Sequence, residues 1–273
     1  MSATTPPGLS PSSVRVLSAQ GVRVHLGGRP VVDGVDLTAP GGQISAIVGP
    51  NGSGKTSLLR ALAGLLPYAG RVTEDGTDLS TLGAAERARR VAYLPQTSAL
   101  RAMLSVREVV ALGRYASQPG LFARTRRDDV QIDEALHRTD ISALAERAYP
   151  KLSGGQQRLV LIARALATGA STLLLDEPTA SLDVRHALSL FGLLESLAND
   201  GYCIVLVLHD LDDVQRHATG AVLLDAGRVQ AHGPPGAASF VSAAEQTYGV
   251  SFVPGDRLGF RTRESVMKGF GTP

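Results

Sequence analysis

Hydrophobic and polar positions alternate in the first part of the chain. The alternation covers residues 14–17, 22–26 and 31–37, and pairs of glycines interrupt it. Because alternation places the apolar side chains of a strand on one face, it predicts short strands of a small antiparallel sheet. Residues 71–76 are interpreted as a further strand and tight turn of that sheet.

Other segments are apolar at nearly every position. Such runs occur at residues 44–48, 172–175, 204–208 and 221–224, and 91–94 is interpreted as one more strand. Uniformly apolar strands that are separated by helices predict a parallel sheet covered on both faces. We therefore expect an α/β protein in which the antiparallel segment leads into a parallel-sheet core.

Helical periodicity dominates the middle of the chain. Ser105 and Glu108 form a capping box in front of a helix, and two further helical patterns follow at 129–137 and 141–147. These patterns predict that about residues 97–165 form a helical insertion within the α/β protein.

The two ends of the chain differ from the rest. Residues 1–12 are rich in Ser, Thr and Pro and are predicted to be disordered. After the Pro234-Pro235 pair, we expect the segment 236–273 to form a helix near 238–248 and then an irregular tail.

Composition narrows the possible partners. The net charge of +2 over 273 residues demands no strongly basic face, so we expect no nucleic-acid partner. The arginine clusters at 87–90 and 124–127 contain no aromatic residues and are interpreted as solvated faces or phospholipid-side contacts. The single Cys203 excludes an intrachain disulfide and suits a reducing compartment. Without a signal-peptide pattern or a run of about 18 apolar residues, the chain is not expected to cross a membrane by itself.

Residues 49–56 carry the clearest chemistry, because they fit the phosphate-binding pattern G-x-x-x-x-G-K-[ST] between a strand and a helix. Glycines let backbone N–H groups turn towards an anion, Lys55 brings positive charge to the β- and γ-phosphates, and Thr56 offers a hydroxyl to Mg²⁺. A nucleoside triphosphate and Mg²⁺ are therefore the predicted ligands. The residues assigned to this site are Gly49, Pro50, Asn51, Gly52, Ser53, Gly54, Lys55, Thr56 and Ser57.

Polar groups follow two of the apolar runs. Asp176 and Glu177 end the first, at the strand edge where parallel sheets bind ligands. Asp176 is expected to hold Mg²⁺, and Glu177 is expected to polarise a water in line with the γ-phosphate or to take its proton. His209 ends the second run, where its imidazole could donate to the γ-phosphate, although a strand-end histidine on its own is more often structural.

A second anion-binding helix start lies far from the first. Residues 152–156 read Leu-Ser-Gly-Gly-Gln, and Ser153, Gly154 and Gly155 precede a helix that is predicted to run from Gln156 to 167. Because one nucleotide needs only one such loop, the second is predicted to serve a nucleotide that another copy of the chain holds.

Together these motifs resemble the ATP-binding subunits of ABC transporters over about residues 14–235. Residues 49–56 are similar to the Walker A motif, 152–156 to the LSGGQ signature, and 173–177 to Walker B with the catalytic glutamate. The resemblance implies ATP hydrolysis by a P-loop NTPase of the ABC ATPase fold, with a RecA-like parallel-sheet core, an N-terminal antiparallel β-subdomain and an inserted helical subdomain. It also implies that one ATP-binding domain spans residues 13–235.

The resemblance also implies roles for single residues. Gln96 falls at the Q-loop glutamine, which contacts the metal and the reacting phosphate, and His209 falls at the switch histidine. Asp183, in the D-loop 181–183, is placed close to the nucleotide. The family implies a head-to-tail homodimer in which ATP lies between the Walker A motif of one protomer and residues 153–156 of the other.

Three positions depart from the common pattern of the family. His25 and Leu26 stand where many members have an aromatic platform, so His25 is the residue expected to stack on adenine. Gly42 replaces a usual Glu and Leu159 a frequent Arg, and neither is expected to touch the chemistry.

Residues 106–115 and 248–250 are similar to segments of importers for iron–siderophores, haem and cobalamin. The similarity implies an ATPase that works with two permease subunits and a substrate-binding protein, as a peripheral protein on the cytoplasmic face of the inner membrane. Ferric-siderophore uptake is the favoured function, with haem or cobalamin next. A soluble ABC ATPase without a membrane partner is the competing class, and Glu177 disfavours a nucleotide-binding regulator without turnover.

Overall fold

The computed structural model describes residues 15–97, 102–116, 125–180, 182–253 and 259–262. The predicted disordered segment 1–12, Ser181 of the D-loop, Arg124 and the tail from residue 263 lie outside the described residues.

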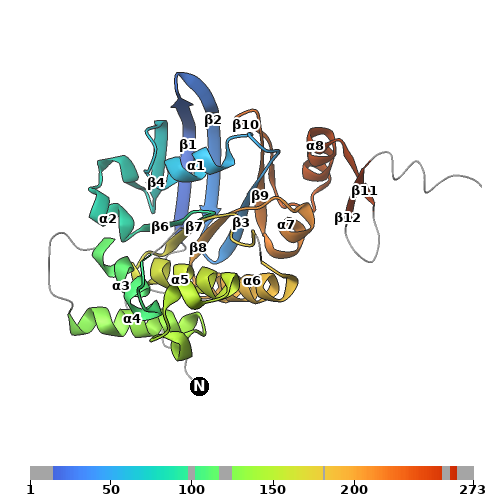
Figure 1. The fold of residues 1–273 in the computed structure, drawn as a ribbon. Helices are drawn as coiled ribbons and strands as arrows, with labels where there is room; N and C mark the ends of the chain where they lie inside the picture. Colours follow the sequence, from blue (N-terminus) through green and yellow to red (C-terminus); the bar gives the residue numbers. More distant parts are fainter. Residues whose placement is uncertain (1–14, 98–101, 117–124, 181, 254–258, 263–273) are drawn as a thin grey trace, which may run out of the picture.

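Two sheets form the centre of the protein (Figure 1). The first has four antiparallel strands in the order β2-β1-β4-β5, with bounds Arg29–Pro40, Val16–Leu26, Ala69–Glu74 and Thr77–Asp78. The second has six strands in the order β10-β9-β3-β8-β7-β6, with bounds Arg228–Gly233, Gly220–Asp225, Gln43–Val48, Cys203–Val207, Thr172–Asp176 and Val91–Leu94. Neighbouring strands of the second sheet are parallel except for β10 against β9, so the predicted parallel core is confirmed.

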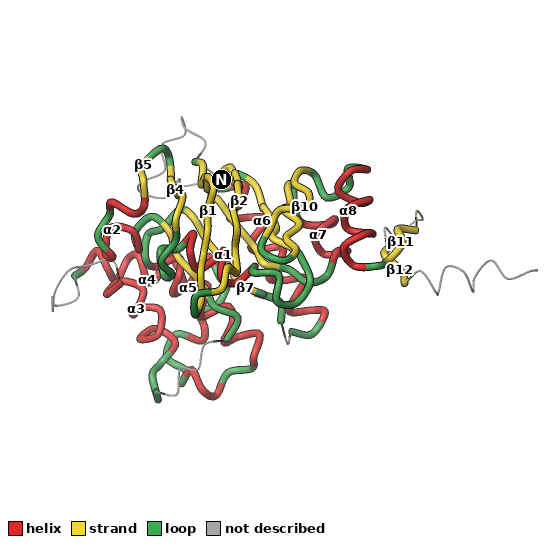
Figure 2. Tube along the Cα trace, turned by 90° about the horizontal axis from the view of Figure 1, so that it is seen from above, coloured by secondary structure: helices red, strands yellow, loops and turns green. Residues whose placement is uncertain are grey.

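Helices cover both faces of the parallel sheet (Figure 2). α1 lies between the two sheets, and α5 and α6 lie on the opposite face, with α3 and α4 packed against α5. The helices are α1 Lys55–Leu62, α2 Ala84–Ala88, α3 Val106–Ala116, α4 Arg126–Arg138, α5 Gly154–Ala167, α6 Val184–Asn199, α7 Leu211–His217 and α8 Ala238–Tyr248. α3, α4 and α5 fall between β6 and β7 in the chain, while the limits 97–165 for a helical subdomain stay a prediction.

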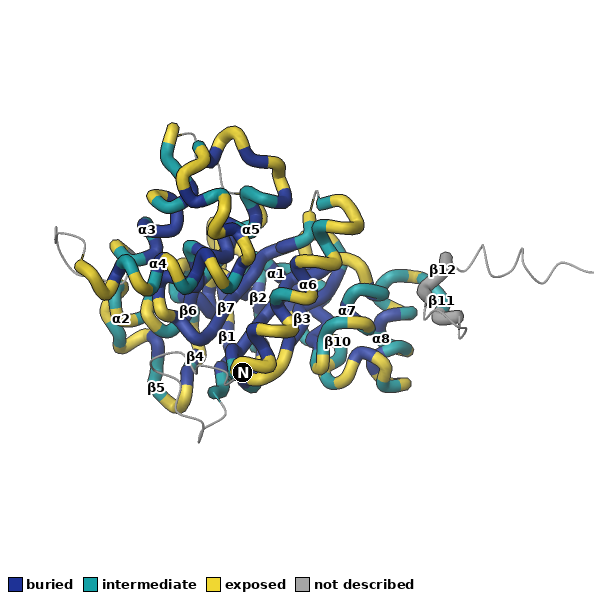
Figure 3. The backbone as a smooth tube through the Cα atoms, turned by 90° about the horizontal axis from the view of Figure 1, so that it is seen from below, coloured by how far each residue is buried: buried dark blue, intermediate teal, exposed yellow. Residues whose placement is uncertain are grey.

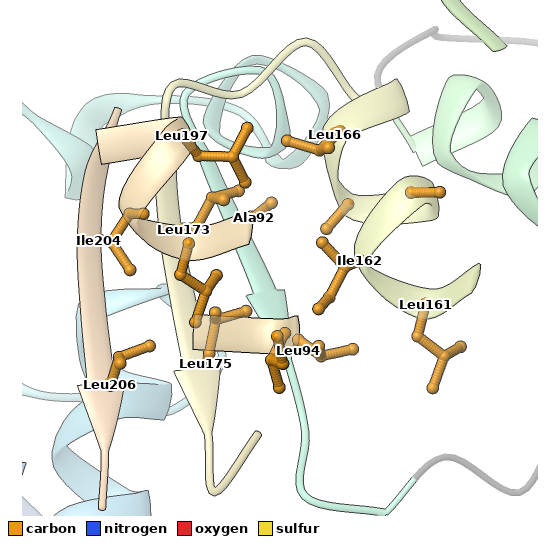
Figure 4. Close-up of a cluster of buried hydrophobic side chains, with 14 of the residues drawn as sticks. Ala92, Leu94, Leu161, Ile162, Leu166, Leu173, Leu175, Leu197, Ile204 and Leu206 are labelled. Atoms are coloured by element: carbon orange, nitrogen blue, oxygen red, sulfur yellow. The ribbon is translucent and has the colours of Figure 1, made fainter. Parts of the chain in front are cut away.

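Successive side chains of the parallel strands enter two different hydrophobic cores. Leu173 and Leu175 of β7 pack towards α5 and α6, whereas Leu174 faces α1 and the antiparallel sheet. Figure 4 shows the first of these cores, where side chains of β7 and β8 meet those of α5 and α6. The central strands β3, β8 and β7 are buried on both faces (Figure 3), which is why they are apolar at nearly every position.

Three predicted elements are wrong in detail. The predicted strands at 14–17 and 22–26 are parts of one strand, β1, which begins at Val16, because Gly21 at φ 56° and the register shifts beside it bend the strand without ending it. The predicted helix 141–147 is only a short 3₁₀ turn, Ser142–Leu144. The N–H groups of Val106 and Arg107 bond to carbonyls of that segment, at Arg147 and Ala145, and these bonds hold it against the start of α3.

The C-terminal segment is more regular than expected. α8 has the predicted bounds, and Gly249 ends it in the left-handed conformation at φ 63°. The chain then forms β11, Val250–Val253, which pairs antiparallel with β12, Gly259–Thr262. The irregular tail is therefore wrong for these residues, because the Gly249 turn sends a Val- and Phe-containing segment into an extended conformation.

Two buried polar side chains, Cys203 and Glu74, make hydrogen bonds from one sheet to the other. Cys203 donates to the carbonyl of Ala39 at 3.3 Å, and burial raises the pKa of its thiol to about 12. Glu74 is fully buried and ties β4 to β7, because it accepts from the Thr172 hydroxyl at 2.8 Å and meets Arg90 at 3.4 Å. Burial raises the pKa of Glu74, and the bond from Thr172 opposes that rise.

Because the pKa of Glu74 is higher in the folded than in the unfolded chain, its contribution to stability is full below the unfolded pKa and is lost as pH rises through the folded pKa. Glu74→Gln cannot titrate. Between about pH 4 and about pH 8, the free energy of unfolding should therefore fall more for the wild type than for Glu74→Gln, by up to about 1.4 kcal/mol for each pH unit that lies between the two pKa values. Urea denaturation at both pH values measures this, with the exposed Glu86→Gln as control. Parallel pH profiles for wild type and Glu74→Gln would contradict it.

Candidate nucleotide-binding and catalytic site

The phosphate loop lies between β3 and α1, at the carboxyl edge of the parallel sheet. Two of its glycines have backbone conformations outside the range of other residues, Gly49 at φ 153° and Gly54 at φ 102°. A Cβ atom at Gly49 would overlap the carbonyl oxygen of Leu224, and one at Gly54 would overlap that of Val31. The loop therefore fits only because neither residue has a side chain, and its N–H groups are fixed in direction by the flanking strands.

Lys55 begins α1 and is buried inside this loop. Its ammonium donates to the carbonyls of Gly49 at 2.7 Å and Pro50 at 2.9 Å. Burial lowers the pKa of Lys55, and the carboxylates of Glu177 and Asp176 act in the opposite direction. A desolvated cation inside a loop of N–H groups suits the phosphates of a nucleotide.

Thr56 and Asp176 place two oxygen ligands side by side. The Thr56 hydroxyl donates to Asp176 Oδ1 at 3.1 Å, and the Tyr93 hydroxyl donates to Asp176 Oδ2 at 3.2 Å. Burial raises the pKa of Asp176, and these two hydrogen bonds oppose the rise. Among the described residues there is no cluster of three or more His, Cys, Asp or Glu side chains fit for a metal. The Thr56 hydroxyl and the Asp176 carboxylate nevertheless fit Mg²⁺, which takes one or two protein oxygens together with phosphate and water.

Glu177 lies immediately after β7 and is held from both sides. Gln96 donates to its Oε2, and His209 is hydrogen-bonded to its Oε1. Its backbone is left-handed, at φ 45°, which is uncommon for a residue with a side chain and is typical of functional sites. The structure thus brings Gln96, Glu177 and His209 together, beside the Thr56–Asp176 pair.

Two further side chains of this site, Arg158 and Tyr93, were not predicted from the sequence. Arg158 of α5 is buried, and its guanidinium donates to the carbonyls of Pro95 at 2.9 Å, Gln96 at 3.2 Å and Asp176 at 3.1 Å. Burial lowers its pKa to about 10. Tyr93, besides its bond to Asp176, accepts from Arg60 at 3.3 Å. The available signal was the position of each: an arginine on the buried face of a helix, and a tyrosine in an apolar strand.

The helix start that is predicted to bind a second anion lies apart from the phosphate loop. Ser153 caps α5, which begins at Gly154 rather than at Gln156. The Ser153 hydroxyl accepts from the Gln156 N–H at 3.3 Å, and the Gln156 side chain accepts from the Ser153 N–H at 3.2 Å. Within the described part of the chain, no hydrogen bond joins residues 153–156 to the phosphate loop.

Two remaining site residues lie on other elements. Asp183 caps α6 and pairs with His186, and its side chain is 66% exposed. His25 is an exposed residue near the end of β1, in the hairpin whose second strand places Val31 beside Gly54. The contact of Asp183 with a nucleotide and the stacking of His25 on adenine both stay predictions.

A phosphate loop with paired acids at the carboxyl edge of a parallel sheet defines a P-loop nucleoside triphosphatase. The family model described as "ABC transporter" matches residues 32–180. Over 84% of its length, and 81% of that protein, the chain is 45% identical to the hemin import ATP-binding protein HmuV of Streptomyces coelicolor. The chain belongs to the ABC transporter family, as an ATP-binding subunit of the importer group.

Further similarities agree with this assignment. The chain is 39% identical to the cobalamin import ATP-binding protein BtuD of Halobacterium salinarum, over 80% of this chain and 55% of that protein. An ATP-binding cassette of an ABC transporter, solved in its ADP conformation, superposes with a TM-score of 0.74 at 26% identity over 81% of this chain and 92% of that chain. The predicted family, fold class and ATPase activity are thereby confirmed.

Proposed function

We propose that this subunit hydrolyses ATP with Glu177 as the general base and drives the import of haem. The observation that supports the catalytic part is the position of the Glu177 carboxylate, between Gln96 and His209 and next to the Thr56–Asp176 pair. Such a carboxylate can polarise a water molecule and take its proton as the water attacks the γ-phosphate.

The surrounding residues bind and orient the reacting groups. Lys55 and the N–H groups of the loop would hold the β- and γ-phosphates, and His209, whose ring bonds to Glu177, would donate to the γ-phosphate. Thr56, Asp176 and Gln96 are the residues that would hold Mg²⁺, which neutralises charge on the phosphates when it is bound. Tyr93 and Arg158 orient this set from behind, because they bond to the side chain and the carbonyl of Asp176.

Glu177→Gln removes the carboxylate and keeps the size of the side chain. ATP turnover should fall by about 10²–10⁴-fold, the range that a general base contributes, while ATP affinity stays unchanged. Phosphate release and calorimetry measure the two quantities, and Glu146→Gln, at a carboxylate that is 84% exposed, is the control. Turnover within a few-fold of wild type would show that Glu177 is not the base.

The working form that we propose is a head-to-tail homodimer. Ser153 and Gly154, at the start of α5, are exposed, and so are Val184 at 77% and Leu188 at 57% in the first turns of α6. In a head-to-tail pair the start of α5 covers the nucleotide on the partner's phosphate loop, which explains why one chain carries two anion sites.

Mixing two inactive variants tests this arrangement. Ser153→Arg blocks the signature side of a composite site, and Lys55→Ala removes the cation from the phosphate side. In the heterodimer both defects fall in one composite site, so the other site is intact and part of the ATP turnover should return. Lys55→Ala mixed with Glu177→Gln is the control, because these defects fall in different sites and the mixture should stay inactive. No recovery in the first mixture, with dimers present, would exclude the shared site.

We propose that the permease docks in a groove between the catalytic core and the helices of the 97–165 segment. The relatives named as import proteins imply a permease, and no described helix is long and apolar enough to span a bilayer. The groove has a volume of about 390 Å³, and one of its lining residues, Leu65, is 59% exposed. Its lining is mainly apolar, with two arginines: Ala63, Leu65, Val91, Leu112, Arg87 and Arg164. A subunit docked there would be a peripheral protein on the cytoplasmic face of the membrane, in a complex of two permease subunits with a substrate-binding protein.

Haem is the proposed cargo because relatives of 45% and 46% identity are named as hemin import proteins. Ferric siderophores, which the sequence analysis favoured, and cobalamin are the alternatives. When the chain is co-purified with its permease and binding protein in lipid vesicles, haem should stimulate ATP turnover more than a ferric siderophore or cobalamin. The Glu177→Gln complex is the control for coupled hydrolysis. Stimulation by another chelate alone would reassign the cargo, and ATP turnover that no permease changes would favour a soluble ABC ATPase.

A further inference from the structure

His186 connects the end of the D-loop to the start of α5, the signature helix, whose first turn belongs to the LSGGQ signature at residues 152–156 (the signature loop). It lies in the first turn of α6, and its Nδ1 atom is 2.8 Å from both carboxylate oxygens of Asp183. Asp183 also accepts from the backbone N–H of His186 at 2.9 Å, so the residue is tied at its main chain and at its ring. With Nδ1 fixed on Asp183, the orientation of the imidazole is set.

The ring packs against Gly155 of the signature loop. A Cβ atom at Gly155 would lie 2.5 Å from His186 Cδ2 and 2.7 Å from Cγ, so a side chain there would collide with the ring. Gly155 is buried, in contrast to the exposed Ser153 and Gly154 that precede it. The remaining space between α5 and α6 at this point is about 10 Å³, at the lower limit for one water molecule. The imidazole, rather than solvent, therefore supports the backbone of Gly155.

We propose that His186 is a positioning residue that holds the signature loop in the direction needed to reach the nucleotide of the partner protomer. The inference rests on the proposed head-to-tail dimer. The N–H groups and hydroxyl of residues 153–155 stabilise charge on that nucleotide only if their direction is fixed before the dimer closes. His186 fixes it from behind, and Asp183 fixes His186.

A purely local role, as part of the cap of α6, makes a different prediction. A cap affects the stability of its own helix and has no preference for either of the two composite sites. A positioning residue for the signature loop impairs only the site that its own signature serves, which is the site on the partner's phosphate loop. The two roles can therefore be separated by asking in which composite site the defect appears.

His186→Ala removes the ring. The variant should bind ATP as a monomer with an affinity within about twofold of wild type, while turnover falls about tenfold to hundredfold, the loss typical of a misplaced catalytic element. Calorimetry and phosphate release on the full chain measure these values. His137→Ala, an exposed histidine of α4, is the control and should leave both unchanged. If His186→Ala folds poorly by thermal unfolding, His186→Phe keeps a ring against Gly155 and enters the same assays, with a smaller expected loss.

Mixtures locate the defect. His186→Ala with Lys55→Ala should recover turnover, because both defects fall in one composite site, whereas His186→Ala with Ser153→Arg should not. The reverse pattern, or unchanged turnover in the single variant, would overturn the role proposed for His186. The mixture of Ser153→Arg with Lys55→Ala serves as reference: if it recovers and the His186 mixtures do not follow, only the His186 proposal fails. If the reference itself fails, the shared-site dimer fails and the His186 proposal with it.

Discussion

A phosphate loop enclosed by two sheets can carry no side chain where the sheets approach it. Gly49 lies against the carbonyl of Leu224 in β9, and Gly54 lies against that of Val31 in β2, so one strand of each sheet is in backbone contact with the loop. This close approach fixes where α1 begins and so places Thr56 against Asp176 at the end of β7. The direction of the anion-binding N–H groups and the metal-binding oxygens both follow from it. A single added methyl group at either glycine would separate a sheet from the loop.

Local chemistry explains which features the sequence predicted. Gly49, Lys55 and Asp176 could be proposed from the sequence because the motif needs each residue type at that spacing, and the parallel sheet could be predicted because its strands are apolar at nearly every position. Arg158 and Tyr93 were missed because their partners lie far away in the chain. The helix predicted at 141–147 is wrong for the same reason: the carbonyls of this segment accept hydrogen bonds from the start of α3, which lies far away in the chain. The roles proposed for Ser153 and Asp183 depend on a second copy of the chain, which the sequence of one chain does not describe.

Arg158 connects α5 to the catalytic site. It belongs to α5, whose first residues are the proposed second anion site, and its guanidinium bonds to the carbonyls of Gln96 and Asp176 in the catalytic site of the same chain. Burying an arginine is costly, and three carbonyl partners offset that cost while one nitrogen, Nε, has no partner in the described structure. Arg158 therefore joins the backbone beside Gln96 directly to α5.

The single thiol of the chain, Cys203, is placed so that it does not interfere with site-specific labelling. Cys203 is buried within β8 with its pKa raised to about 12, so at neutral pH it is protonated and shielded, and alkylating reagents attack thiolates. A cysteine introduced at an exposed position would then be the sole reactive thiol in an otherwise native protein. Site-specific fluorophores, spin labels or cross-links can be attached without first replacing a core residue, and the two protomers of an assembly can be labelled separately before they are mixed.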